Sequence, residues 1–186
     1  MKVICLLVIL TSFVALGAVE FQDSFFLGVT QSKLSGDFPD EVDGIRFGIL
    51  NGVQFGYTLL GQFENNFSLG LITRYIEKGW MTEDDSDLYT VKNNYFELAL
   101  RAGYIMPKLN YIGLHPYSGL GMGFFLNSEQ PVKAHQNQHM SFIVGIDVNL
   151  WEKFVIDFNY NIGLTDIYDG IDAKYNVFGV SLGKKF

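Results

Sequence analysis

The sequence predicts an all-β fold, an eight-stranded antiparallel up-and-down transmembrane β-barrel. Three observations predict it. Eight stretches alternate apolar residues with small or polar ones at the two-residue period of a β-strand. Clusters of turn-forming and acidic residues separate these stretches. The face opposite the apolar one carries many glycines and charges of both signs, which suits the narrow interior of a small barrel.

The composition limits what the protein does. Its 186 residues suit one domain, and no apolar run after the N-terminus is long enough for a spanning helix. A formal charge of −7 gives no electrostatic footprint for nucleic acid. The one cysteine, Cys5, lies in the N-terminal apolar run, so the mature chain has neither a disulfide nor a thiol metal site. We therefore expect no metal, no cofactor and no nucleic-acid partner.

The N-terminus has the pattern of a signal peptide. Lys2 is followed by the apolar run 3–16, and the small residues of 15–17 stand at the spacing expected of a cleavage site. We predict a signal peptide over residues 1–17 and a barrel domain over residues 18–186. A membrane anchor is the alternative, but the run is short and the acidic Glu20 and Asp23 follow it closely.

Four strands are expected in the first half of the chain, at 24–32, 45–59, 67–75 and 95–104. In the first, Phe25, Leu27 and Val29 share one face. In the second, Asn51 interrupts the apolar row, and we expect a bulge there.

Four more strands are expected at 119–126, 140–150, 154–163 and 175–186, with a tight reversal at 151–153. The longer connections, 36–43, 80–88, 127–138 and 165–174, then share one end of the barrel. Because the number of strands is even, both termini lie at the other end.

Alternation alone does not say which face points inward. In a soluble lipocalin-like barrel the apolar face would surround a ligand, and in a membrane barrel it would face lipid. Glycine on the other face favours the membrane barrel, because a water-exposed strand face would carry Thr, Lys or Glu. The glycines of that face are Gly28, Gly48, Gly52, Gly56, Gly70, Gly119, Gly121, Gly123, Gly145, Gly163, Gly179 and Gly183.

The same face carries charges of both signs, which we predict to form a polar network in the lumen. An eight-stranded barrel has an interior just wide enough for side chains, so this network is expected to plug the lumen and exclude a general diffusion pore. A proton or ion path and ordinary surface charges on a soluble sheet are the alternatives. The predicted network comprises Arg46, Arg74, Glu97, Arg101, Asp147 and Asp157.

Aromatic residues near the strand ends form two groups, as the interfacial girdles of membrane barrels do. Any one of them alone would also suit an ordinary core. The expected girdle residues are Tyr57, Tyr75, Trp80, Tyr104 and Trp151.

The last strand places Phe178, Val180, Leu182 and the terminal Phe186 on its apolar face. It resembles the closing strand of bacterial outer-membrane β-barrels, which serves in that family as the recognition signal for the membrane assembly machinery. Lys184 departs from the family pattern, which usually has an apolar residue there, but a lysine near the headgroups lifts its amine to water.

Segments 75–79, 116–123 and 160–167 resemble the small barrels of the OmpX and OmpA type and, more closely, the porin-family (PorT-like) barrel domain. The resemblance covers nearly the whole mature chain. It implies an outer-membrane location with periplasmic termini, and contact with outer-membrane lipid, lipopolysaccharide and the barrel assembly machinery. We expect a structural or interaction role, in adhesion or anchoring, through the external loops and with an extracellular or envelope protein as a possible partner. We do not expect an enzyme.

One motif suggests catalysis. His139 and Ser141 lie on one strand face, and this spacing is similar to the His-x-Ser element of outer-membrane lipid A deacylases. No matching acid is evident beside this pair. A lipid-modifying enzyme is therefore the alternative and not the expected function. The acidic residues at 83–87 do not have EF-hand spacing, and we expect a solvated charge run.

Overall fold

The structure is a computed structural model of residues 1–186. It describes residues 20–36, 41–42, 45–83, 88–107, 109–128, 137–151, 153–167 and 172–186, without the side chains of 41–47, 82, 83, 88 and 89. The predicted signal peptide, residues 1–17, and Cys5 lie outside this part. Within the described ranges, no helix is long and apolar enough to cross a membrane.

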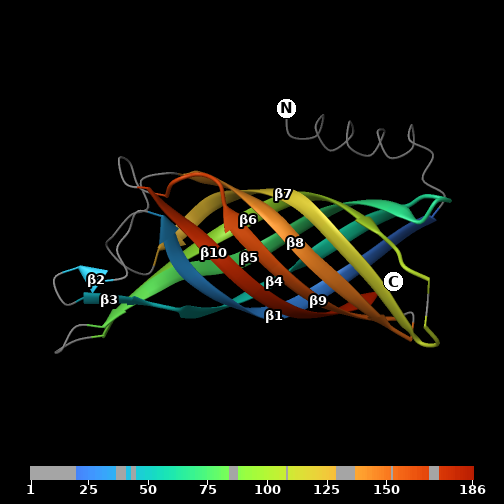
Figure 1. The fold of residues 1–186 in the computed structure, drawn as a ribbon, viewed down its shortest axis with the longest axis horizontal. Helices are drawn as coiled ribbons and strands as arrows, with labels where there is room; N and C mark the ends of the chain where they lie inside the picture. The colour runs from blue at the N-terminus through green and yellow to red at the C-terminus, as the bar shows by residue number, and fades with distance from the viewer. Residues whose placement is uncertain are drawn as a thin grey trace.

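Eight long antiparallel strands form a closed barrel, with two short strands beside the first connection (Figure 1). The eight-stranded prediction is confirmed. In the part of the chain that the structure describes, the strands are β1 (Glu20–Gly36), β2 (Glu41–Val42), β3 (Ile45–Gly48), β4 (Leu50–Gln62), β5 (Phe67–Glu83), β6 (Leu88–Tyr104), β7 (Ile112–Ser128), β8 (Gln138–Leu150), β9 (Phe154–Gly163) and β10 (Ala173–Lys185).

The topology is a simple meander. The order within the sheet is β2-β3-β5-β4-β1-β10-β9-β8-β7-β6, and the pairing of β5 with β6 closes the ring. The first and last strands meet over a long register that runs from Ser24 opposite Lys185 to Gly36 opposite Ala173. Closure gives every barrel strand two neighbours, so the wall of the barrel has no free edge.

The barrel has two distinct ends. The described residues of three connections, 63–66, 105–107 with 109–111, and 151 with 153, lie at the end that also holds Glu20 and Phe186, which we call the turn end. There the Trp151 amide donates to the Tyr111 carbonyl at 3.2 Å and ties two connections together. The strand ends that lead into the other connections, such as Gly36 beside Ala173 and Glu83 beside Leu88, lie at the opposite end, which we call the loop end.

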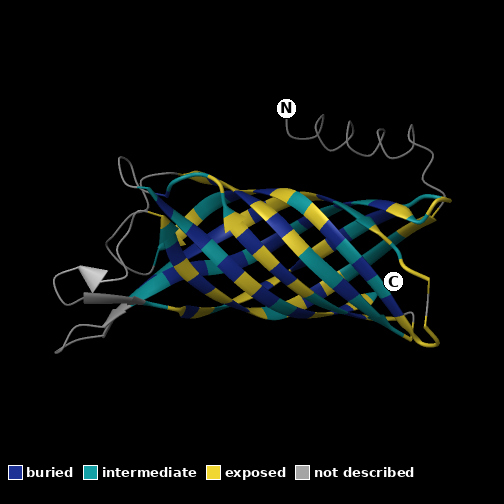
Figure 2. Ribbon diagram, in the orientation of Figure 1, coloured by how far each residue is buried: buried dark blue, intermediate teal, exposed yellow. Residues whose placement is uncertain are grey.

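The apolar face points outward, as the glycine argument predicted. On β1, Phe25, Leu27 and Val29 are 52%, 62% and 61% exposed, whereas Phe26 and Thr30 are 8% and 2% exposed. Buried and exposed residues alternate in the same way along the barrel wall (Figure 2). Because the interior holds the charges, the lipocalin-like alternative, with its apolar lumen, is wrong.

Several strands are longer than predicted. The predicted loop 80–88 is mostly strand, since β5 continues to Glu83, which pairs with Leu88 of β6. β7 begins at Ile112, within the stretch expected as a connection. In each case, hydrogen bonds to a neighbouring strand satisfy the backbone N–H and C=O groups past the point where the apolar alternation ends. The expected irregularity at Asn51 falls at Ile49, between β3 and β4.

Candidate functional site in the barrel lumen

The charged residues of the lumen form two clusters separated by an apolar layer. Along β6, Glu97 belongs to one cluster and Arg101 to the other, with the buried Ala99 between them. Of the predicted residues whose side chains are described, Arg74 pairs with Glu97 and Arg101 with Asp147, whereas Asp157 accepts from a tyrosine hydroxyl. They form two sites rather than one network. The apolar layer comprises Phe26, Ile72, Ala99, Tyr117 and Ile143.

The loop-side cluster is centred on the fully buried carboxylate of Glu97. The Arg74 Nε donates to Glu97 Oε1 at 2.8 Å, and a second guanidinium nitrogen donates to the same oxygen. The Lys78 Nζ donates to Oε2 at 2.8 Å. Arg74 and Glu97 are directly opposite in the β5–β6 register, so the pairing of the strands itself brings them together. Lys78 was not among the predicted residues.

Neutral amide oxygens accept the remaining hydrogen bonds of the Arg74 guanidinium. Its nitrogens donate to Asn161 Oδ1 at 2.7 Å, to Gln54 Oε1 at 3.1 Å and to Asn159 Oδ1 at 3.4 Å. Gln54 in turn donates to the Ser181 hydroxyl at 2.9 Å. Side chains from β4, β5, β6, β9 and β10 thus meet across the lumen, and the cluster braces the barrel wall.

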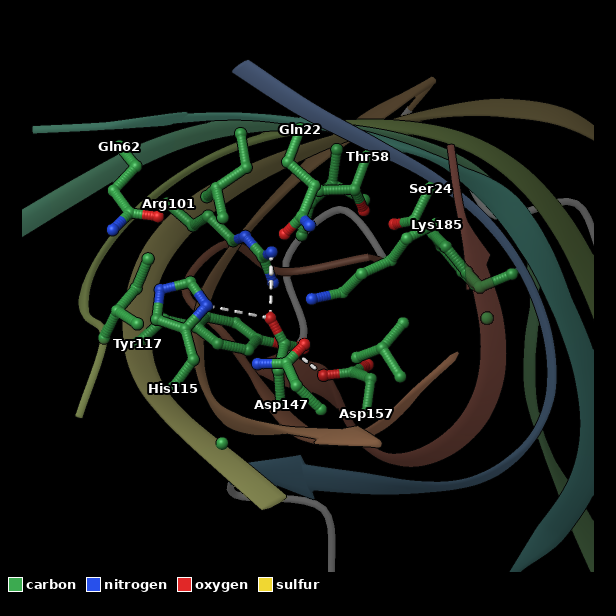
Figure 3. Close-up of a pocket in the computed structure, with 18 of the residues that line it drawn as sticks. Gln22, Ser24, Thr58, Gln62, Arg101, His115, Tyr117, Asp147, Asp157 and Lys185 are labelled. Carbon is green, nitrogen blue, oxygen red and sulfur yellow. Dashed lines mark hydrogen bonds and ion pairs between the residues drawn. The ribbon is translucent and has the colours of Figure 1, made fainter. Parts of the chain in front are cut away.

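The turn-side cluster is centred on Asp147 of β8 (Figure 3). Arg101 Nη2 lies 2.9 Å from Asp147 Oδ2, and His115 Nδ1 lies 3.1 Å from the same oxygen. Asp157 is directly opposite Asp147 in the β8–β9 register and accepts from the Tyr117 hydroxyl at 2.6 Å. Because two carboxylates on neighbouring strands repel, the Arg101 guanidinium is needed to hold this pair.

A cavity of about 840 Å³ lies inside the turn end. Its lining includes Arg101, His115, Asp147 and Asp157, and Arg74 also lines it. Polar side chains such as Gln62 complete the lining, and Figure 3 shows them converging on the same space. The lumen is therefore hollow at the turn end.

The loop end is closed by apolar side chains. Ile167, from the connection between β9 and β10, is 2% exposed, and its amide donates to the Ala173 carbonyl at 2.8 Å. The Lys174 Nζ lies 3.6 Å from Asp166 Oδ1 and donates to Asp172 Oδ1 at 2.5 Å, and this hydrogen bond lowers the pKa of Asp172. The closing cluster comprises Leu34, Ile76, Tyr95, Ile167, Ala173, Tyr175 and Val177.

The two candidate catalytic residues lie inside the barrel. His139 and Ser141 are 4% and 1% exposed, and neither lines the turn-end cavity. His139 Nε2 lies 2.7 Å from Lys78 Nζ and 3.7 Å from Glu97 Oε2. Among the contacts of these described residues, no hydrogen bond joins His139 to Ser141, and the Ser141 Oγ has no partner. The imidazole belongs to the loop-side cluster.

Most of the expected girdle residues lie on the outer surface. Tyr57, Tyr104 and Trp151 are 39%, 48% and 63% exposed. Tyr75 stacks on Phe55 with ring centroids 5.0 Å apart.

The prediction for Trp80 is wrong. β5 runs on without a break, so Trp80 keeps the inward parity of Arg74, Ile76 and Lys78. It is partly buried and packs against the cluster that closes the loop end.

The closing strand has the predicted outward row. Phe178, Leu182 and Phe186 are 42%, 59% and 73% exposed, and Val180 is partly buried on the same face. Lys184 also faces outward, with its Nζ 5.4 Å from the centroid of the Phe186 ring. Lys184, the residue that departs from the family pattern, therefore lies beside the terminal aromatic ring.

Some predicted residues lie outside the described side chains. Arg46 belongs to β3, but its side chain is not described, and neither are the acidic side chains at 83–87.

Three residues that the sequence analysis missed lie just outside its predicted strands, whereas neutral partners such as Gln54 and Asn161 lie within them. Lys78 lies four residues beyond Arg74 on the same face, and His115 and Tyr117 precede the predicted start of the fifth strand. Extending the inward parity along each strand would have found all three.

The family of the chain follows from its sequence and agrees with this geometry. A family model described as an outer membrane protein beta-barrel domain matches residues 18–169. The chain belongs to this family. The match extends over seven of the eight barrel strands, and β10 completes the outer-membrane barrel by pairing with β1. No curated protein matches.

Solved outer-membrane proteins are similar to the chain at low sequence identity. Neisserial surface protein A (NspA) is 8% identical, with 88% of this chain and 97% of that chain covered and a TM-score of 0.52. Ail, the attachment invasion locus protein of Yersinia pestis, is 21% identical, with 90% and 100% covered and a TM-score of 0.49. OprG from Pseudomonas aeruginosa is 13% identical, with 89% and 95% covered and a TM-score of 0.49. The likeness to NspA supports the barrel fold alone.

Proposed function

We propose that this outer-membrane barrel has a structural or interaction role, in adhesion or anchoring, and that it acts through its loop end with an extracellular or envelope protein as partner. The observation that carries the proposal is that side chains fill the lumen on its loop side. The apolar cluster closes the loop end, and the Arg74–Glu97–Lys78 cluster lies beneath it with side chains that are at most 3% exposed. Since solutes have no open path along these described side chains, we assign the role to the connections at the loop end.

The outward surface supports the proposed lipid partners. The outward rows of apolar side chains fit the acyl chains of outer-membrane phospholipid and lipopolysaccharide. Export through a signal peptide at 1–17, recognition of β10 by the assembly machinery and the kinship with OmpX-type and PorT-like barrels are parts of the same proposal.

We also propose that His139 and Ser141 do not modify lipid. Both are buried in the lumen, while a lipid headgroup lies outside the barrel wall. The His139→Ala variant should leave the lipid A profile of expressing cells unchanged, and a lost deacylated species would restore the enzymatic alternative.

Two measurements test the proposal. Liposomes that contain the purified barrel should show no swelling in isosmotic sugar, and swelling like that of a diffusion porin would refute the block on the loop side of the lumen. Cells that express a chain with 129–136 replaced by a Gly/Ser linker should lose adhesion to the surface or partner that binds the wild type. A matched replacement of turn-end residues 64–66 should keep it. Equal binding by both variants would refute a loop-end role.

A further inference from the structure

Three polar side chains near the turn end form a chain of hydrogen bonds. The Ser68 Oγ lies 2.7 Å from His115 Nε2, and His115 Nδ1 lies 3.1 Å from Asp147 Oδ2. The residues come from β5, β7 and β8, and they are 0%, 2% and 4% exposed. A carboxylate only accepts hydrogen bonds, so His115 Nδ1 carries the hydrogen. The Nε2 of the neutral ring then accepts the hydroxyl hydrogen of Ser68.

This is the arrangement of a nucleophile, a base and a residue that orients the base. We propose that Ser68, His115 and Asp147 form a serine hydrolase site for small carboxylic esters, beside the turn-end cavity that His115 and Asp147 line. Ser68 is the nucleophile, His115 the general base and acid, and Asp147 the positioning residue. This activity is separate from the proposed role of the loop end, and it departs from the expectation that the protein is not an enzyme.

The structure contains a specific arrangement that allows His115 to reach Ser68. The two residues lie on strands that flank β6, so the imidazole must cross β6. It does so over Gly103, where an added Cβ would lie 2.6 Å from His115 Nε2. Any larger residue at 103 would push the ring away from Ser68. Arg101 also holds the Asp147 carboxylate, at 2.9 Å, and so fixes the group that orients the ring.

The cavity supplies the remaining parts of such a site. Gln62 is directly opposite Ser68 in the β4–β5 register and lines the cavity. The proposal assigns its side-chain amide as the donor to the oxyanion that forms next to Ser68. Leu60 and Ile105 line the same cavity and give the acyl group an apolar wall. Because Ser68 has no exposed surface, a carbonyl reaches it only by displacing a neighbouring side chain, which restricts the substrate to small, flexible esters.

The reaction balances with water as the second reactant. Ser68 Oγ bonds to the carbonyl carbon while its proton moves to His115 Nε2. The bond to the alcohol oxygen then breaks, and Nε2 returns the proton to the leaving alcohol. Water next attacks the acyl-serine with proton transfer to Nε2. The acyl group leaves as a carboxylic acid, and the proton returns to Ser68.

The test is covalent labelling of the folded, full-length barrel with diisopropyl fluorophosphate, a small reagent that phosphorylates activated serines. Intact mass should show one adduct, and peptide mapping should place it on Ser68. Ser68→Ala and His115→Ala should lose the adduct, and Ser141→Ala, which removes another buried inward serine, should keep it. If Ser68 of the wild-type protein stays unmodified, the proposal is refuted, whether or not the variants fold.

The role of Asp147 is tested by rescue. Asp147→Ala should slow labelling of Ser68 by more than about tenfold, since an orienting carboxylate is worth up to about 10⁴-fold in such triads. Asp147→Glu should restore part of the rate. If the labelling rate of both variants falls only in proportion to the fraction of folded barrel, Asp147 has a structural role and is not part of the site.

Discussion

Replacing Glu97 with glutamine should strongly destabilise the barrel. Glu97 is 0% exposed and is the carboxylate that both Arg74 and Lys78 contact in the loop-side cluster. The substitution leaves two buried cations without their counter-charge. Removing one partner of a buried ion pair typically costs about 3–5 kcal/mol. Because side chains from five strands meet at this cluster, the loss is felt by the whole barrel wall.

Urea unfolding in lipid vesicles, followed by the heat-modifiable band on a gel, measures this loss. With an m value of about 1–3 kcal/mol/M, the midpoint should fall by at least about 1 M. Adding Lys78→Met to Glu97→Gln removes one of the unpaired cations and should recover part of the shift. Asp172→Ala breaks an exposed pair with Lys174 and should leave the midpoint in place. An unchanged midpoint for Glu97→Gln would refute the bracing role of the cluster.

Three further predictions concern the wall and the strand ends. The chain has two tryptophans, so Trp80→Phe leaves Trp151, whose fluorescence should be quenched by lipids brominated near the headgroup. The Trp151→Phe variant leaves the inward Trp80, which should escape this quenching, and the reverse pattern would contradict both assignments. Gly123→Val should lower the yield of folded barrel, because the His139 ring occupies the space of an added side chain. The control Leu120→Val changes an outward residue that is 53% exposed, and equal yields would remove the packing argument. Deleting Phe186 should reduce the amount assembled in the outer membrane without changing the total synthesised, and Tyr111→Ala, at an exposed turn residue, should not.

The sequence was sufficient to predict the strand faces, because outward lipid contact and a narrow lumen impose a strict two-residue alternation. Arg74, Glu97, Arg101 and Asp147 were found by that alternation alone. Which of them pair depends on strand register, and register is set by turn geometry that no single strand reveals.

The other differences have the same origin. Trp80 stands at the start of the stretch 80–88 that the sequence predicts as a loop, but β5 continues through Trp80 to Glu83 and keeps its parity. His115 was missed because its strand begins earlier than the alternation indicated, and its contact with Ser68 spans an intervening strand. Contacts across two strands follow from barrel curvature and from the space at Gly103, which are properties of the closed fold.

The measurement that tests the account most directly is fractionation of expressing cells, followed by gel mobility of the detergent-extracted protein with and without boiling. A closed barrel with an outward apolar surface predicts recovery in the outer membrane and a folded band that shifts on boiling. A soluble periplasmic species whose mobility does not change on boiling would contradict the outward face, and with it the assignment of the charged clusters to the lumen.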